Sequence, residues 1–169
     1  MNEADQSPTR LLLADANILI DLAQAGGLGL IGDLIRFGLA EIFVPRVIYD
    51  EVSTEVSETQ VVELGITILP VSVDLSRRVL EYPDRALSRP DRTLLLLAME
   101  AGYGVWSNDR RLRSNCVDKG VAVYWEFQLL GELVKTGRLA KRVLVELARK
   151  VETINVFQKG VADDLEKKL

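Results

Sequence analysis

The stretch Leu11-Leu12-Leu13-Ala14-Asp15-Ala16-Asn17 decides how this chain is expected to fold. Four apolar residues lead directly into an aspartate, and an amphipathic segment follows almost at once. A short, continuous apolar run is typical of a strand that is buried on both faces, as in a parallel sheet. Asp15 then stands at the carboxyl end of that strand, where open α/β sheets bind their ligands. Asp15 or Asn17 could also cap the following helix, and this stretch alone leaves both roles open.

Strands and helices alternate along the rest of the chain. Further strands are expected at 41–44, 66–71, 104–107 and 121–124, and helices at 18–25, 30–37, 47–56, 74–81, 91–101 and 110–117. Because helices separate the strands, the pattern predicts a three-layer α/β/α fold with a central, mainly parallel five-stranded sheet. From residue 126 the pattern is helical, with a break at 135–138 and another helix expected at 161–169. We therefore expect one domain at 1–125 and a helical C-terminal extension at 126–169, packed on that domain or on a partner.

Composition excludes several classes of protein. A chain of 169 residues with 48% hydrophobic residues can bury a substantial core. No apolar run approaches the roughly 20 residues of a membrane helix, and the polar residues 1–10 are not typical of a signal or transit peptide. The single cysteine, Cys116, excludes an internal disulfide and indicates a reducing compartment, so we expect a cytoplasmic protein without a membrane. The absence of histidine removes His-based catalytic triads and the usual zinc enzymes.

The segment Gly27-Leu28-Gly29-Leu30-Ile31-Gly32 matches the G-x-G-x-x-G fingerprint of dinucleotide-binding sites. That motif meets a pyrophosphate only where its glycines form the first strand-to-helix turn. Here the helix expected at 18–25 separates the first strand from the glycines. We therefore interpret the segment as a flexible turn between two helices.

Acidic residues follow two of the expected strands. Asp109 comes after the strand at 104–107, as Asp15 comes after the first strand, and Ser107 and Asn108 offer further oxygen atoms beside it. The carboxyl ends of parallel strands meet at one edge of a sheet. We therefore expect Asp15 and Asp109 to lie close together.

Two helices supply further acids. Asp91 begins a helix on its apolar face, although Ser88 and Asp91 also fit a capping box, and the two roles can coexist. Glu51 lies three residues after Ile48, so we expect it on the helix face that packs against the sheet, whereas Asp50 should point into solvent.

Asp15, Glu51, Asp91 and Asp109 are thus expected to meet at one edge of the sheet. Four neighbouring carboxylates repel one another and raise one another's pKa unless a cation neutralises them. Oxygen ligands without His or Cys favour a hard divalent ion, Mg²⁺ or Mn²⁺. Such a site can activate water and stabilise the charge of a phosphodiester under attack.

With these residues the chain resembles the PIN domain, a family of metal-dependent ribonucleases that includes the VapC-like toxins of prokaryotic toxin–antitoxin pairs. The motifs are Asp-x-Asn, Val-Pro-x-Val-x-x-x-Glu-Val, Pro-Asp-x-x-x-Leu-x-Leu-Ala and Ser-Asn-Asp, which begin at Asp15, Val44, Pro90 and Ser107. The resemblance covers about residues 10–125, and the acids arrive in the family's order.

The resemblance implies cleavage of single-stranded or looped RNA with Mg²⁺ or Mn²⁺. In that interpretation Asp15, Asp91 and Asp109 bind the metal, Glu51 binds it or orients the water, and Asn17, Ser107 and Asn108 support them. It further implies the toxin of a toxin–antitoxin pair, with an antitoxin protein as a possible partner. The apolar positions of the extension predict a homodimer or a groove for a partner helix.

Arginines surround two of the proposed metal ligands. Between positions 85 and 113 there are six basic residues and three acidic ones, although the whole chain has a net charge of −4. The basic residues are Arg85, Arg89, Arg92, Arg110, Arg111 and Arg113. We expect Arg89, Arg92, Arg110, Arg111 and Arg113 to contact RNA phosphates, which position a backbone without reading its bases. An ordinary solvated helix end would show the same charges.

Two other classes of function fit parts of the pattern. A PIN-fold protein could bind RNA without cleaving it, although the presence of all four acids argues against this. A phosphatase of the haloacid type would use Asp15 as a nucleophile, but it needs a second aspartate where this chain has Asn17. A receiver domain needs a lysine after a later strand, and neither Ser107-Asn108-Asp109 nor Tyr124-Trp125 supplies one.

Overall fold

The apolar run at 11–14 forms the central strand β1 (Arg10–Ala14) in the computed structural model, which describes residues 10–169 but not the side chain of Phe157. Within these residues five strands form one sheet in the order β3-β2-β1-β4-β5, and every neighbouring pair is parallel. The other strands are β2 (Ala40–Pro45), β3 (Thr67–Leu69), β4 (Gly104–Trp106) and β5 (Val123–Tyr124). The expected five-stranded sheet is confirmed, and it is wholly parallel.

Burial on both faces explains why β1 is almost uniformly apolar. Leu12, Leu13 and Ala14 are each no more than 1% exposed. Leu12 pairs with Gly104 of β4, and a Cβ atom at position 104 would lie 2.8 Å from Cδ2 of Leu12. Glycine therefore allows β1 and β4 to pack at this register.

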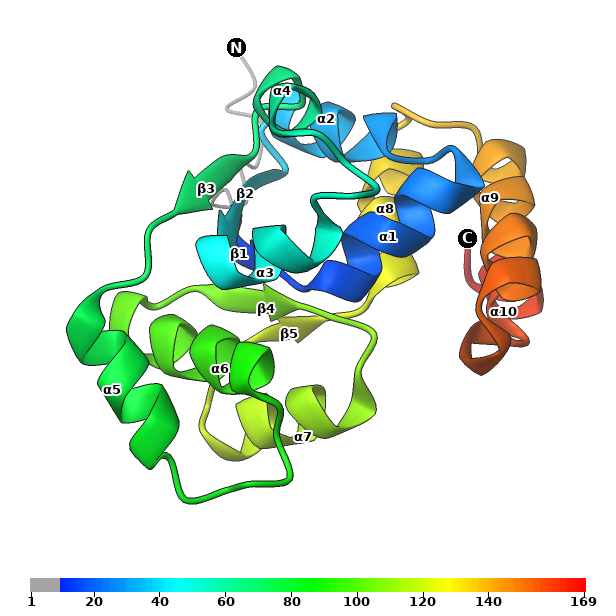
Figure 1. The fold of residues 1–169 in the computed structure, drawn as a ribbon. Coiled ribbons are helices and arrows are strands. Elements are labelled where there is room, and N and C mark those ends of the chain that lie inside the picture. Colours follow the sequence, from blue (N-terminus) through cyan, green and yellow to red (C-terminus); the bar gives the residue numbers. More distant parts are fainter. Residues whose placement is uncertain (1–9) are drawn as a thin grey trace, which may run out of the picture.

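Helices cover both faces of the sheet, as Figure 1 shows. On one side lie α1 (Ala16–Ala25), α2 (Gly29–Arg36), α3 (Arg46–Val52) and α4 (Glu58–Glu63). On the other side lie α5 (Val73–Glu81), α6 (Arg89–Ala101) and α7 (Arg110–Asp118). Right-handed connections require this division, because the chain moves from β1 to β3 in one direction and from β4 to β5 in the other. The predicted three-layer α/β/α fold is confirmed.

The helix expected at 47–56 ends earlier and is followed by a second helix that was not expected. α3 ends at Val52, yet Val56 beyond it is fully buried, so the apolar spacing continues past the helix end. Helix α4 then begins at a capping box: the Gln60 backbone N–H donates to Ser57 Oγ at 3.2 Å, and the Ser57 N–H donates to Gln60 Oε1 at 2.9 Å.

The C-terminal extension packs against the first two helices. It consists of α8 (Glu126–Lys135), α9 (Lys141–Ile154), the 3-10 turn η1 (Val156–Gln158) and α10 (Val161–Lys168). Helix α9 lies along α1, and α8 lies between α2 and α9 (Figure 1). Phe127, Leu130, Leu147 and Val151 join the same hydrophobic core as the sheet. Most of the apolar stripe that predicted a dimer or partner groove is therefore buried within the chain itself.

Among residues 10–169 no single helix has the length and apolar character needed to cross a membrane; only α1 and α2 taken together, bent by 115°, reach those limits. The apolar side chains of α1 instead belong to the core. The expectation that residues 1–10 form no targeting segment falls almost wholly outside the described part of the chain.

Candidate active site

The carboxyl ends of β1 and β4 lie side by side, at the point where the order of the strands reverses. The Asp15 backbone N–H donates to the Trp106 carbonyl at 3.0 Å, which continues the pairing of these two strands. Reversal of the strand order opens a crevice at the carboxyl edge of an α/β sheet, and ligands bind there. Asp15 and the loop from Ser107 to Asp109 both begin at this crevice.

Ser107 links the two strand ends. Its buried hydroxyl donates to Asp15 Oδ2 at 2.6 Å and accepts a hydrogen bond from the Asp109 backbone N–H at 3.0 Å. The second oxygen of Asp15, Oδ1, accepts from the Ala16 N–H at 2.7 Å, so Asp15 is also the N-cap of α1. The structure therefore shows the capping role of Asp15, at the carboxyl end of β1.

Asp15 is a carboxyl group with a strongly perturbed pKa. The pKa of Asp15 is raised from 3.8 to about 6. Burial is the largest cause and the negative charges of Asp91 and Asp109 add to it, while hydrogen bonds from Ser107 and Ala16 lower the pKa in part. Asp91 and Asp109, from two other parts of the chain, are thus close enough for their charges to affect Asp15.

Asp109 is the N-cap of α7, and Asp91, the third residue of α6, forms the capping box of that helix with the N-cap Ser88. Asp91 Oδ2 accepts from the Ser88 N–H at 3.0 Å and from the Ser88 hydroxyl at 2.6 Å, while Ser88 Oγ accepts from the Asp91 N–H, which completes a capping box. Asp109 Oδ1 accepts from the Leu112 N–H at 2.6 Å. These bonds fix both carboxylates at helix N-termini that face the crevice.

Glu51 lies on the flank of α3, so its predicted position on the helix face against the sheet is wrong. That face is formed by Ile48, Tyr49 and Val52, whereas Glu51 is exposed. The inward face of α3 differs from the predicted one because Val47, on which the prediction relied, is only half-buried. Partial burial and the negative charge of Asp91 nevertheless raise the pKa of Glu51, so Glu51 faces the same group of acids.

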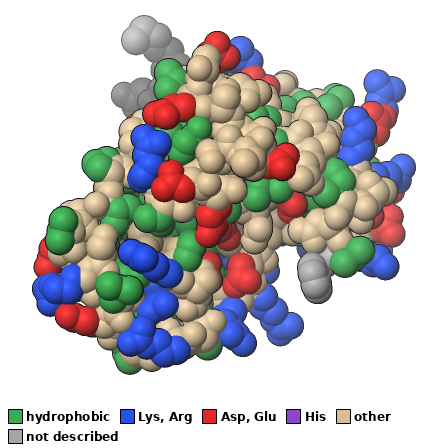
Figure 2. All heavy atoms as spheres, in the orientation of Figure 1, with side chains coloured by type: hydrophobic (Ala, Val, Ile, Leu, Met, Phe, Trp, Pro, Cys, Tyr) green, Lys and Arg blue, Asp and Glu red, His purple; other side chains and the backbone are tan. Residues whose placement is uncertain are grey.

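The four acids match the donor set of a hard divalent cation. None of them forms an ion pair with a lysine or arginine within the described chain. Figure 2 shows acidic side chains gathered between the region of α1 and α3 and that of α6 and α7. In residues 10–169 no three acidic side chains converge tightly enough to enclose an ion as they lie. Three of the carboxylates instead use oxygens to cap helices, and uncompensated repulsion keeps such groups apart.

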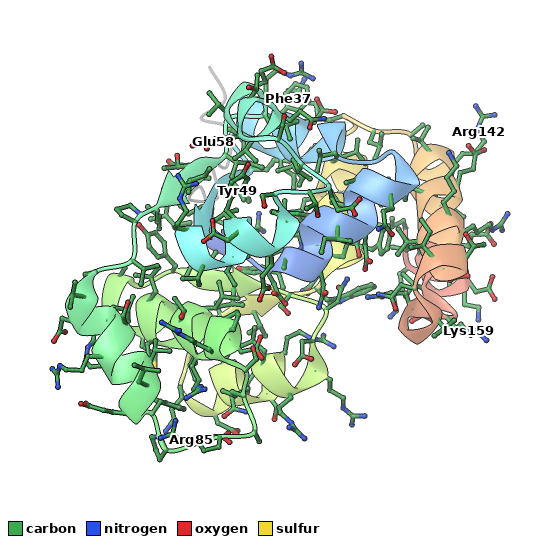
Figure 3. The ribbon with its side chains drawn as sticks, in the orientation of Figure 1. Phe37, Tyr49, Glu58, Arg85, Arg142 and Lys159 are labelled. Carbon is green, nitrogen blue, oxygen red and sulfur yellow. The ribbon has the colours of Figure 1, made fainter. Side chains whose placement is uncertain are left out.

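The arginines of the expected RNA surface divide into two sets. Arg92 donates from Nη1 to the Val79 carbonyl at 2.9 Å and from Nε to the Ser88 carbonyl, so it ties α6 to α5. Arg111 donates to the Ala86 carbonyl at 2.9 Å, and Arg85, which lies at the far end of the α5–α6 loop in Figure 3, donates to the Leu80 carbonyl. These three side chains hold local structure.

Arg110 and Arg113 instead line a cavity of about 700 Å³ beside Asp109. The cavity also contacts Asn17 and Asn108 and extends to the C-terminal extension. Arg89 is exposed at the start of α6. Positive charge close to the acids therefore comes mainly from α7.

Glu126, which the sequence did not single out, anchors the loop that carries Asp109. Asn108 Nδ2 donates to Glu126 Oε2 at 2.7 Å, and the Glu126 N–H donates to Asn108 Oδ1 at 3.1 Å. Glu126 is fully buried, and burial together with the charge of buried Asp21 raises its pKa to about 8, against the hydrogen bond from Asn108. Glu126 follows β5 almost as Asp15 follows β1. A search for an acidic residue just after each expected strand would therefore have found it.

Comparison with solved structures identifies a similar fold, and neither the family models nor the curated proteins contain a match. A PilT N-terminus domain protein from the hyperthermophilic archaeon Sulfolobus solfataricus P2 superposes with a TM-score of 0.53. The alignment covers 72% of this chain and 92% of that protein, at 10% sequence identity. This chain therefore has the fold of a PilT N-terminus (PIN) domain.

Proposed function

We propose that this protein is a metal-dependent endoribonuclease that hydrolyses phosphodiester bonds in single-stranded or looped RNA. The observation that carries the proposal is Asp15: a buried carboxyl, tied to Asp109 through Ser107 and with its pKa raised by the charges of Asp91 and Asp109, at the crevice of a PIN-like sheet. Burying acids together without a basic partner is costly for folding, and a cation removes that cost.

Asp15, Asp91 and Asp109 are the residues that would hold Mg²⁺ or Mn²⁺. The chemistry that such an ion supplies is activation of water and stabilisation of negative charge on the phosphodiester. Ser107 holds the carboxylate of Asp15, and the Asn108–Glu126 pair holds the loop of Asp109. Glu51, exposed and beside Asp91, binds the same ion or orients the attacking water.

The first test is cleavage of a labelled single-stranded RNA. We expect activity with Mg²⁺ or Mn²⁺, none in excess EDTA, and a loss of at least about 100-fold in Asp15→Asn, the scale of removing one electrostatic contact to a transition state. Circular dichroism would verify that the variant is folded. Cleavage that survives both EDTA and Asp15→Asn would reject the proposed site.

Glu51 and Asp50 provide a matched pair in the same assay. Both are exposed on α3, and the charge of Asp91 acts on Glu51. We expect Glu51→Gln to reduce cleavage severely and Asp50→Asn to leave it nearly unchanged. Equal losses in the two variants would show that α3 does not present Glu51 to the reaction.

We also propose that the protein acts in the cytoplasm as the toxin of a toxin–antitoxin pair, and that it forms a homodimer or binds an antitoxin helix. The support is the resemblance of its motifs to VapC-like toxins, together with exposed Val143, Ile154 and Val156 on the extension. A neighbouring reading frame for a small DNA-binding protein, and a complex of the two by sedimentation, would test this.

The alternative is an RNA-binding protein that does not cleave. It is favoured by one observation, the absence within residues 10–169 of three acids already arranged around an ion position. If the protein binds RNA but does not cleave it in Mg²⁺ or Mn²⁺, this alternative is supported.

A further inference from the structure

The cavity beside Asp109 connects the crevice of the sheet with the C-terminal extension. One wall is formed by Asp109, Arg110 and Arg113, and the opposite wall by residues of η1 and the start of α10. Its volume of about 700 Å³ lies within the range of roughly 300–1,000 Å³ that is usual for small-ligand sites. One end of a bound molecule would therefore lie next to the proposed metal ligands and the other end against the extension.

Positive charge and amide groups make the cavity suitable for a nucleotide. Arg110 and Arg113 bring two guanidinium groups, and the Nε of Arg113 is buried without a hydrogen-bond partner among the described residues. Asn17 and Gln158 bring carboxamide groups from α1 and the extension, and Asn155 beside them donates to Asp21 at 3.0 Å. Guanidinium groups bind phosphate, and carboxamides bind the polar edges of bases.

Trp125 supplies the aromatic surface that a base requires. It follows β5 directly, is half-buried, and lines the cavity. Its ring meets that of Phe127 in a T-shaped contact, with centroids 6.4 Å apart, and Phe127 is fully buried. A core residue thus holds the indole in place, and a base that stacks on a fixed aromatic ring loses less entropy on binding.

We propose that this cavity binds the base and sugar of one unpaired nucleotide of the RNA substrate, with the base stacked against Trp125 and its phosphate beside Arg110 and Arg113. The inference rests on the proposed ribonuclease function and adds to it a subsite for substrate recognition that the C-terminal extension completes. The subsite selects unpaired RNA, because a base within a duplex cannot reach Trp125.

The test is binding of fluorescein-labelled single-stranded RNA hexamers in EDTA, where metal-dependent cleavage is absent. We expect Trp125→Leu to bind about 5- to 150-fold more weakly than the wild type, the effect of losing one base–aromatic stack. Trp125→Phe, which keeps an aromatic ring, should restore most of the affinity. Equal affinity of the wild type and Trp125→Leu, or no binding by the wild type, would overturn the proposal.

Hexamers with one abasic nucleotide, placed at each position in turn, provide a sharper measurement. Wild-type affinity should fall most for one position, and Trp125→Leu should abolish that dependence. A uniform fall at every position in the wild type would contradict a single base subsite. Arg110→Ala should weaken binding several-fold, whereas Arg142→Ala, an exposed arginine on α9 far from the cavity in Figure 3, should not.

The outcomes separate this subsite from the proposed activity. If the wild type cleaves RNA with metal and Trp125→Leu binds and cleaves equally well, the subsite proposal is wrong and the ribonuclease proposal is supported. If RNA binding depends on Trp125 but no cleavage occurs in Mg²⁺ or Mn²⁺, the subsite proposal is supported and the ribonuclease proposal is wrong.

Discussion

Asp15 is only 4% exposed, and both of its oxygens accept hydrogen bonds, yet it remains costly to ionise. Two hydrogen bonds stabilise its charged form, but burial and the nearby charges of Asp91 and Asp109 outweigh them. The metal-free protein therefore pays a free-energy cost for this carboxylate at neutral pH. That cost gives the residue a measurable signature in the stability of the protein.

The pH dependence of stability follows from the pKa of Asp15, 3.8 in the reference state and about 6 in the fold. Because the folded pKa is raised, the stability from the protonated carboxyl is fully present below pH 3.8 and is lost as pH rises through about 6. The full loss is about 3 kcal/mol at about 1.4 kcal/mol per pKa unit.

Asp15→Asn lacks this charge, so its stability relative to the wild type should rise as pH rises from 5 to 7 in EDTA. The rise is at most that full loss. The variant also leaves the Ser107 hydroxyl without its acceptor, which lowers its stability at both pH values. Urea unfolding at both pH values gives the difference. A difference that does not change with pH would contradict the raised pKa.

At the level of single residues, strand ends were the most reliable guide. Asp15 and Asp109 were predicted because an acid directly after a buried apolar run has few alternatives to the carboxyl edge of the sheet. Arg92 and Arg111 were assigned to RNA from charge alone, and their bonds to the carbonyls of Val79 and Ala86 depend on the packing of α5 and α6, which the local sequence does not encode. Asn155 reaches Asp21 from a distant part of the chain, at 3.0 Å, and no local pattern indicates it.

Asp91 and Asp109 both take part in the N-terminal capping of a helix, α6 and α7 respectively, so the proposed metal site would use carboxylates that also serve capping. An N-cap satisfies backbone N–H groups and favours negative charge at the positive end of the helix dipole. Asp91 and Asp109 therefore have a stabilising local partner even while they repel Asp15. A substitution at either position can remove the negative charge, the helix cap, or both. The choice of the new residue decides which of these is lost.

Asp109→Asn should separate the charge from the cap, because Asn caps a helix about as well as Asp. Because the variant lacks the charge of Asp109 near Asp15, its free energy of unfolding in EDTA should be higher by on the order of 1 kcal/mol near neutral pH, and its melting temperature should rise accordingly. Mg²⁺ should raise the melting temperature of the wild type by mass action and that of the variant much less.

The control is Asp109→Ala, which loses the charge and also the cap, at a cost of about 1 kcal/mol. It should be less stable than Asp109→Asn in EDTA. If Asp109→Asn melts below the wild type and Mg²⁺ shifts both equally, Asp109 is a structural residue and the proposed metal site is wrong.

At the scale of elements, the sequence predicted every strand, but not every helix end. Long apolar periods reflect burial of one helix face, so α1 and α6 were found within a few residues. Short elements depend on local capping instead: α4 was missed, although Ser57 and Gln60 carry its capping box. The phase of α3 was wrong because Tyr49, with a large buried ring, outweighs Val47 in deciding which face is inward.

The whole molecule is a sheet domain joined to a helical extension by close packing rather than by a linker. Gly27, in the segment that imitates a dinucleotide fingerprint, lies at this junction between α1 and α9. A Cβ atom there would be 2.6 and 2.7 Å from the two Cδ atoms of Leu147. The glycine therefore allows α9 to pack closely against α1, and this packing places the extension beside the crevice at the carboxyl edge of the sheet.

Gly27→Ala should destabilise the protein by about 1 kcal/mol, the low end of the usual cost of overpacking a buried contact, because the side chain of Leu147 must move. Gly29→Ala is the matched control. A Cβ atom at Gly29 has no neighbour within 4 Å, and Gly29 is the first residue of α2, so alanine there should be neutral or stabilising by up to about 1 kcal/mol. Urea unfolding of the two variants gives both values. Equal effects would mean that the position of the extension, with the cavity wall it forms, does not depend on the contact between Gly27 and Leu147.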